Sequence, residues 1–223
     1  MTVAAEQPPG DLPRAGDGLR LQVLATEHWS LLATRSMTWS EVMSRIAIHL
    51  TVASASLVVL ALVVQASGFG TAFRVLSIGL ASVVLLLGTL TAVRVRNASE
   101  EDAVLLLGMN RLRAAYLDID PGLEKYLVTS AYDDKAGVMS TYTLGIRRSM
   151  PRHVLGSTNL FMTAVNAVVA GTLGSLVAST VTGMAWAIAV VGVVSGVAYV
   201  VATVLADRQV FARDPVAPRF PSP

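Results

Sequence analysis

The stretch IAIHLTVASASLVVLALVVQAS, residues 46–67, decides the fold class of this 223-residue chain. It contains no Asp, Glu, Lys or Arg. A helix of about 20 residues crosses the roughly 30 Å hydrocarbon core of a bilayer. Because lipid offers no hydrogen bonds, the backbone amides of such a stretch must be bonded within their own segment. The stretch therefore predicts a membrane-spanning α-helix.

Three further stretches share this length and are almost free of charge, at residues 73–93, 158–179 and 184–206. The whole chain is 53% hydrophobic and 14% charged, with a mean hydropathy of +0.60. A soluble domain carries about 25% charged residues. We therefore predict an all-α polytopic membrane protein with four transmembrane helices.

The four spans divide the chain into a series of segments. The predicted order is a disordered N-terminus (1–18), an amphipathic interfacial helix (19–37), a transmembrane hairpin (38–96), a small helical cytoplasmic segment (97–156), a second hairpin (157–206) and a disordered C-terminal tail (207–223).

The positive residues lie almost entirely on one side of these spans. Sixteen of the 17 Lys and Arg residues fall in the termini or the central segment, and only Arg74 lies near an opposite turn. Positive charge is retained in the cytoplasm. Both termini and the central segment are therefore expected to be cytoplasmic, in a protein of the plasma membrane. This topology accounts for the pI near 9.2, so no nucleic acid is expected as a partner.

The residues before the first span, ATEHWSLLATRSMTWSE (25–41), predict the entry into the membrane. On a helical wheel the apolar residues from 19 to 35 gather on one side, which is typical of a helix lying at the membrane surface. Thr38 and Glu41 have the spacing of a capping box. They predict a break at residues 36–38, with a helix cap at membrane entry.

The adjacent residues Glu27 and His28 raise the alternative of a metal or acid–base pair. Neighbouring side chains on a helix point about 100° apart, since 3.6 residues make one turn. The two groups therefore do not converge by themselves, and the interfacial helix is the favoured interpretation.

The central segment carries an apolar stripe with coiled-coil-like spacing over about two heptads. It is too short for a free coiled coil and is expected to pack on a helix of the same chain or of a second copy. The candidate partner interface comprises Leu105, Met109, Leu112, Tyr116 and Ile119.

Acidic residues and arginine pairs raise questions of ligand binding in the same segment. Carboxylate clusters can hold divalent cations, but these acids lack the EF-hand spacing and are balanced by basic residues. Salt-bridged, solvated faces without a metal are therefore the favoured interpretation, and a divalent-cation site is the alternative. The acids in question are Asp118, Asp120, Glu124, Asp133 and Asp134. The pairs Arg94/Arg96 and Arg147/Arg148 lie near membrane entry points, where anionic lipid headgroups are the expected partner.

The spans hold no charge at depth, and their small and polar residues are the remaining candidates for a site. The third span places amide, hydroxyl and small residues on one face, and the fourth contains a GxxxG pattern that allows close helix approach. These candidate pore or helix-packing residues are Asn159, Thr163, Asn166, Gly174, Gly192 and Gly196. Helix packing is the favoured interpretation, and a pore-lining stripe in an oligomer is the alternative.

Catalytic and cofactor motifs are missing from the sequence, including GxSxG, HExxH, the P-loop and the Rossmann glycine pattern. No enzyme activity and no cofactor are therefore predicted. The favoured function is a membrane scaffold or regulatory interaction protein that acts through its cytoplasmic helices, on an unknown partner or a second copy. The alternative is a homo-oligomeric ion channel or small-solute permease.

Two blocks of the chain resemble those of uncharacterised four-span membrane proteins of actinobacteria. They are LATEHWSLLATRSMTWSE (24–41) and GMNRLRAAYLDIDPGLEKYLVTSAYDD (108–134). The excess of Arg over Lys also fits a high-GC genome. The resemblance implies a cell-membrane location and no known activity, so it assigns no role to any residue.

Overall fold

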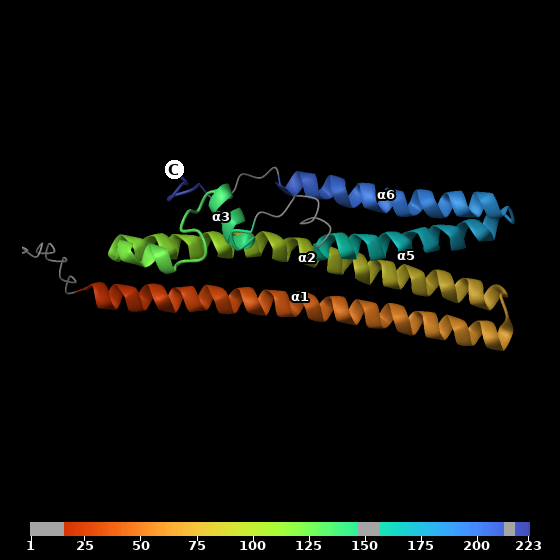
Figure 1. The fold of residues 1–223 in the computed structure, drawn as a ribbon. Helices are drawn as coiled ribbons and strands as arrows, with labels where there is room; N and C mark the ends of the chain where they lie inside the picture. The colour runs from red at the N-terminus through yellow and green to blue at the C-terminus, as the bar shows by residue number, and fades with distance from the viewer. Residues whose placement is uncertain (1–15, 147–156, 212–216) are drawn as a thin grey trace, which may run out of the picture. The chain divides into compact units, whose positions relative to one another are not determined.

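The computed structural model describes residues 16–146, 157–211 and 217–223, and every regular element within these ranges is helical. The elements are α1 (Asp17–Ser67), α2 (Thr71–Ile119), the 3₁₀ helix η1 (Pro121–Tyr126), α3 (Lys135–Tyr142), α5 (Thr158–Val181) and α6 (Ala185–Phe211) (Figure 1). Four of them are long and apolar enough to cross a membrane. The predicted all-α polytopic class is thereby confirmed.

The first two long helices extend far beyond their predicted spans. Helix α1 has 51 residues and α2 has 49, so each is about 75 Å long at 1.5 Å per residue. By contrast, α5 and α6 have 24 and 27 residues, close to one membrane crossing. The predicted disordered segment 1–18 falls mostly on residues 1–15, outside the described ranges, and α1 already begins at Asp17.

The predicted break at residues 36–38 is wrong, because α1 runs through it without interruption. Thr38 is therefore an interior helix residue and not an N-cap. The segment contains no Gly or Pro to stop the helix, and Glu41 bonds to arginine side chains rather than to a free backbone amide. Helix α2 likewise runs through Ser99, whose hydroxyl donates to the Val95 carbonyl, a bond typical of a serine inside a helix.

The chain divides into two compact units. We call the first the small unit; it combines Met1–Arg35, Val104–Ile146 and Pro218–Pro223. We call the second the bundle unit; it combines Ser36–Ala103 and Arg147–Ala217. Helices α1 and α2 each contribute residues to both units.

The core of the bundle unit lies where α1, α2 and α5 meet. Its buried side chains are Val42 and Ile46 from α1, Ala92, Val95 and Ala98 from α2, and Met162 from α5. The alanines are small enough to let α1 and α5 approach α2 closely. Trp39 packs against this core and donates from its indole nitrogen to the buried Asp102 carboxylate at 2.9 Å.

In the small unit, the start of α1 packs on the second half of α2. The His28 ring stacks on Tyr116, with ring centroids 6.0 Å apart. Beyond α2, η1 begins at Pro121 as the Asp-Pro-Gly sequence predicts, and the Asp120 carboxylate accepts a hydrogen bond from the Gly122 amide.

Helix α3 is short. It ends at Tyr142 and is followed by positive φ angles at Leu144 and Gly145. Residues 147–156 lie outside the described ranges, and with them the predicted lipid contacts of Arg147 and Arg148.

The predicted disordered tail, residues 207–223, is wrong at both of its described ends. Helix α6 continues to Phe211, and residues 218–223 belong to the small unit, where they bond to Asp133 and Asp134.

Candidate functional site

The polar side chains of the third predicted span lie inside the bundle unit. Asn166 is fully buried and donates from Nδ2 to the Tyr199 hydroxyl of α6 at 3.0 Å. That hydroxyl lies 3.2 Å from the Thr89 hydroxyl of α2. A hydrogen-bonded chain of three side chains therefore joins α2, α5 and α6.

A histidine from α1 completes this group. His49 is 2% exposed, and its ring lies against Gly88 of α2. A Cβ atom at position 88 would stand 2.7 Å from His49 Cε1 and would overlap the Asn166 amide oxygen. Only glycine therefore allows the two side chains to approach α2 at this point.

We call His49, Thr89, Asn166 and Tyr199 the intramembrane polar cluster. Each of the four long helices supplies one member. Within the described residues, the two ring nitrogens of His49 and the amide oxygen of Asn166 have no hydrogen-bond partner. Such groups are costly to bury without a partner.

The rest of the predicted polar stripe also faces other helices. Asn159 donates to the Asp207 carboxylate of α6 at 3.2 Å, and Asp207 forms an ion pair with Arg96 of α2. Thr163 is buried. These side chains therefore serve contacts between the helices of one chain.

The predicted glycines lie where α5 and α6 pack against each other. A Cβ atom on Gly196 would stand 2.9 Å from the Ala167 carbonyl, and one on Gly192 would stand 3.0 Å from the Gly171 carbonyl. A Cβ on Gly174 would overlap the Ser195 side chain. The two backbones approach each other closely, as small residues permit in membrane helices.

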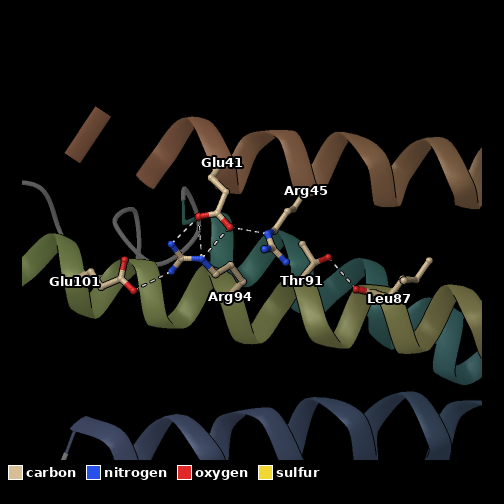
Figure 2. A network of polar contacts seen from close by, with 6 residues as sticks. All are labelled: Glu41, Arg45, Leu87, Thr91, Arg94 and Glu101. Carbon is tan, nitrogen blue, oxygen red and sulfur yellow. Dashed lines mark hydrogen bonds and ion pairs between the residues drawn. The ribbon is translucent and has the colours of Figure 1, made fainter. Parts of the chain in front are cut away.

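An ion-pair network links α1 to α2 just outside the predicted spans, before the first and after the second (Figure 2). The Glu41 carboxylate lies 2.8 Å from Arg45 Nε and 2.9 Å from Arg94 Nη2. Arg94 also pairs with Glu101, seven residues later on α2, at 3.0 Å. Glu41 therefore bridges two helices, in place of the capping role predicted for it.

In the small unit, the predicted stripe on α2 is partly covered by the chain itself. Met109 is buried, Tyr116 stacks on His28, and Leu105, Leu112 and Ile119 are half-buried. The stripe packs within the chain, which was one of its two predicted uses.

Asn110, also on α2, ties the loop and α3 to that helix. It is fully buried and donates to the Tyr132 carbonyl at 2.6 Å. Its carbonyl oxygen accepts from the Thr141 hydroxyl at 2.8 Å and from Arg113 at 2.7 Å. By binding the Tyr132 carbonyl, Asn110 helps to position the neighbouring Asp133.

Asp133 and Asp134 hold the last residues of the chain. The Asp133 carboxylate accepts from the amides of Arg219 and Phe220 at 2.8 and 2.7 Å, and its own amide donates to the Phe220 carbonyl at 3.0 Å. The Asp134 carboxylate accepts from both the amide and the hydroxyl of Ser222, each at 2.9 Å.

The charges of the two carboxylates are stabilised by these bonds. Burial acts to raise the pKa of Asp133, but the Arg219 amide, the Arg111 guanidinium at 2.7 Å and the Phe220 amide outweigh it and lower that pKa. The pKa of Asp134 is lowered by the amides of Gly137 and Ser222.

The five acids considered as a cation site have separate roles. Asp120 begins η1, Asp134 begins α3, and Asp133 binds the C-terminal segment. Asp118 and Glu124 are exposed. Within the described ranges, no three His, Asp or Glu side chains come together as metal ligands.

Sequence reasoning missed three features of these sites. His49 falls on the buried face of α1, seven residues after Val42 and three after Ile46, a spacing that could have revealed it. The Arg96–Asp207 pair and the binding of the C-terminal segment join residues far apart in the chain, so no local pattern signals them.

No family model matches the chain, and comparisons with curated proteins and with solved structures gave no match.

Proposed function

We propose that the chain is a multi-pass plasma-membrane protein that acts by interaction, as a scaffold or regulatory protein. In this proposal the small unit recognises the partner from the cytoplasm and the bundle unit anchors the chain. The observation that carries the proposal is that α1 and α2 are continuous helices, each of which contributes to both units.

A shared helix offers a direct route from recognition to the membrane. A partner that shifts α1 or α2 within the small unit acts on the same helices that form the bundle core. The ion pairs of Glu41 and Arg94 link the two helices to each other at the start of the bundle unit. Small shifts of helices are an established structural route for such signalling.

The small unit also offers apolar surface for recognition. Within the described residues, Tyr126 is 70% exposed, Val128 81%, Leu144 61% and Ile146 54%. Exposed apolar side chains in this number are typical of a contact surface for another protein or a membrane. Aromatic and large aliphatic residues are also the usual anchors of protein interfaces.

The alternative, an oligomeric channel or permease, has one observation in its favour. His49 and the Asn166 oxygen are buried polar groups without partners among the described residues, and intramembrane polar residues often mark a transport path. The hydrogen bonds of Asn159 and Asn166 to α6 favour a role in helix packing instead.

The predicted topology can be tested because the chain has no cysteine. Single cysteines at Phe69, Val181 and Val128, all highly exposed, should be labelled with a membrane-impermeant maleimide in intact cells. We expect labelling at 69 and 181 from outside, and at 128 only after permeabilisation. Labelling of 128 in intact cells would contradict the cytoplasmic placement.

The function itself is tested by flux and by crosslinking. Purified chain in liposomes should conduct no ions, and a photo-crosslinker at Val128 in living cells should give a discrete adduct that one at the exposed Asp118 does not. Flux that is abolished by Asn166→Leu and unchanged by Thr172→Val would establish the channel and overturn the proposal. The absence of any adduct from 128, 144 or 146 would also count against it.

A further inference from the structure

The last six residues of the chain, Pro-Arg-Phe-Pro-Ser-Pro, are bound as a peptide ligand would be. Phe220 and Ser222 are half-buried, while Arg219, Pro221 and Pro223 are exposed. Alternate residues therefore face the small unit, as in an extended peptide. We call residues 218–223 the C-terminal segment.

Every backbone N–H group of the C-terminal segment donates a hydrogen bond to the small unit. Proline has no backbone N–H, so the segment has only three such donors, at Arg219, Phe220 and Ser222. All three donate to the carboxylates of Asp133 and Asp134, over distances of 2.7–2.9 Å. The prolines also restrict the free segment, which lowers the entropy lost on binding.

The two carboxylates are also held by contacts that do not involve the segment. The Asp133 side chain is fully buried and is held by Arg111 of α2. Asp134 is fixed by its capping bond to the Gly137 amide, at 2.7 Å. The Tyr132 carbonyl accepts from Asn110, and a Cβ atom at position 137 would overlap the Tyr132 backbone. The two carboxylates are thus positioned by α2 and α3.

We propose that Asp133 and Asp134 form a peptide-binding site for extended, proline-flanked segments, that the chain's own C-terminal segment occupies it, and that the segment of a second copy binds there when the first is released. The second copy is the occupant because its C-terminus carries the same three donors at the same spacing. The biological use of this site rests on the proposed function, whereas the binding of the peptide does not.

Release is required before a second segment can bind. A tethered segment has an effective concentration in the millimolar range, so an intact chain at micromolar concentration keeps its own segment bound. Exchange between copies would then link two chains through their small units.

The test uses the full chain without residues 218–223 and a fluorescent peptide of residues 217–223. We expect the peptide to bind the shortened chain in detergent, by anisotropy, and to bind the intact chain at least tenfold more weakly. Asp133→Asn should weaken binding at least tenfold, and Asp118→Asn, at an exposed position of α2, should not. A peptide with N-methylated Phe220, which lacks one donor, should also bind at least tenfold more weakly.

Absence of peptide binding to a shortened chain with unchanged circular dichroism would overturn the proposal, as would equal binding of the N-methylated peptide. If the shortened chain does not fold, an intact chain with a protease site in residues 212–216 can be folded first and then cut. The freed segment should remain bound and be displaced by excess peptide; its immediate loss would overturn the proposal. These measurements concern the purified chain alone, so they can fail while the crosslinking and flux tests succeed.

Discussion

Asn166 of α5 donates a hydrogen bond to the hydroxyl of Tyr199 of α6 across 3.0 Å, inside the bundle unit. The same hydroxyl lies within hydrogen-bonding distance of Thr89 on α2. One phenol therefore joins three of the four helices that are long and apolar enough to cross a membrane.

Replacing Tyr199 with Phe removes this hydroxyl and keeps the ring. We expect the free energy of unfolding to fall by about 0.6 kcal/mol and by no more than about 1.7 kcal/mol, the average and the maximum measured for hydrogen bonds between membrane helices. Unfolding in mixed micelles measures it. The matched control is Thr172→Val, whose exposed hydroxyl bonds only to its own helix at Val168. Equal effects of the two changes would show that the link between helices contributes nothing.

Gly88→Ala places a methyl group against His49 and Asn166. Overpacking of this kind costs about 1–3 kcal/mol, so we expect a clear loss of stability and an altered environment for the His49 ring by NMR. Gly79→Ala, on the same helix with nothing within 4 Å, should be neutral or slightly stabilising, because alanine favours helix. A stable Gly88→Ala protein with an unchanged ring signal would contradict the close approach.

Single substitutions distinguish the structural roles of Glu41 and Thr38. Because Thr38 lies inside α1, Thr38→Ala should leave the unfolding temperature unchanged. Glu41→Ala removes the bridge to Arg94 and should lower that temperature slightly. The decrease should be largest at low ionic strength, because salt screens exposed charges. If Thr38→Ala proved the more damaging change, the capping role would be restored.

Attachment of the C-terminal segment should depend on pH through Asp133 and Asp134. The pKa values of both carboxyl groups lie below their ordinary values in the folded chain. A lowered pKa stabilises the folded state above the unfolded pKa, and this contribution is lost as the pH falls through the folded value. The difference in unfolding temperature between the intact chain and the chain without residues 218–223 should therefore be constant down to about pH 5 and shrink below about pH 4. A difference that grows on acidification would contradict the assignment.

The sequence by itself determined the parts that depend on local composition. Four charge-poor stretches of membrane length are sufficient to predict four helices, because lipid leaves the backbone no other way to satisfy its hydrogen bonds. The end of α2 at Ile119 and the start of η1 at Pro121 were also predictable, since Asp-Pro-Gly interrupts an α-helix locally.

Only the tertiary structure decided how the charged and polar residues are used. The Thr38–Glu41 pattern allows either a cap or a helix interior. The contacts of Glu41 with Arg94 and of Trp39 with Asp102, both on α2, favour the interior. Similarly, His49 acquires its neighbours Gly88 and Asn166 from two other helices. The proline-rich C-terminus has no pattern of its own, and it takes up a conformation because two buried or half-buried carboxylates 85 residues or more away accept its amides. Contacts at such sequence separation leave no periodic signal, so composition and spacing could not reveal them.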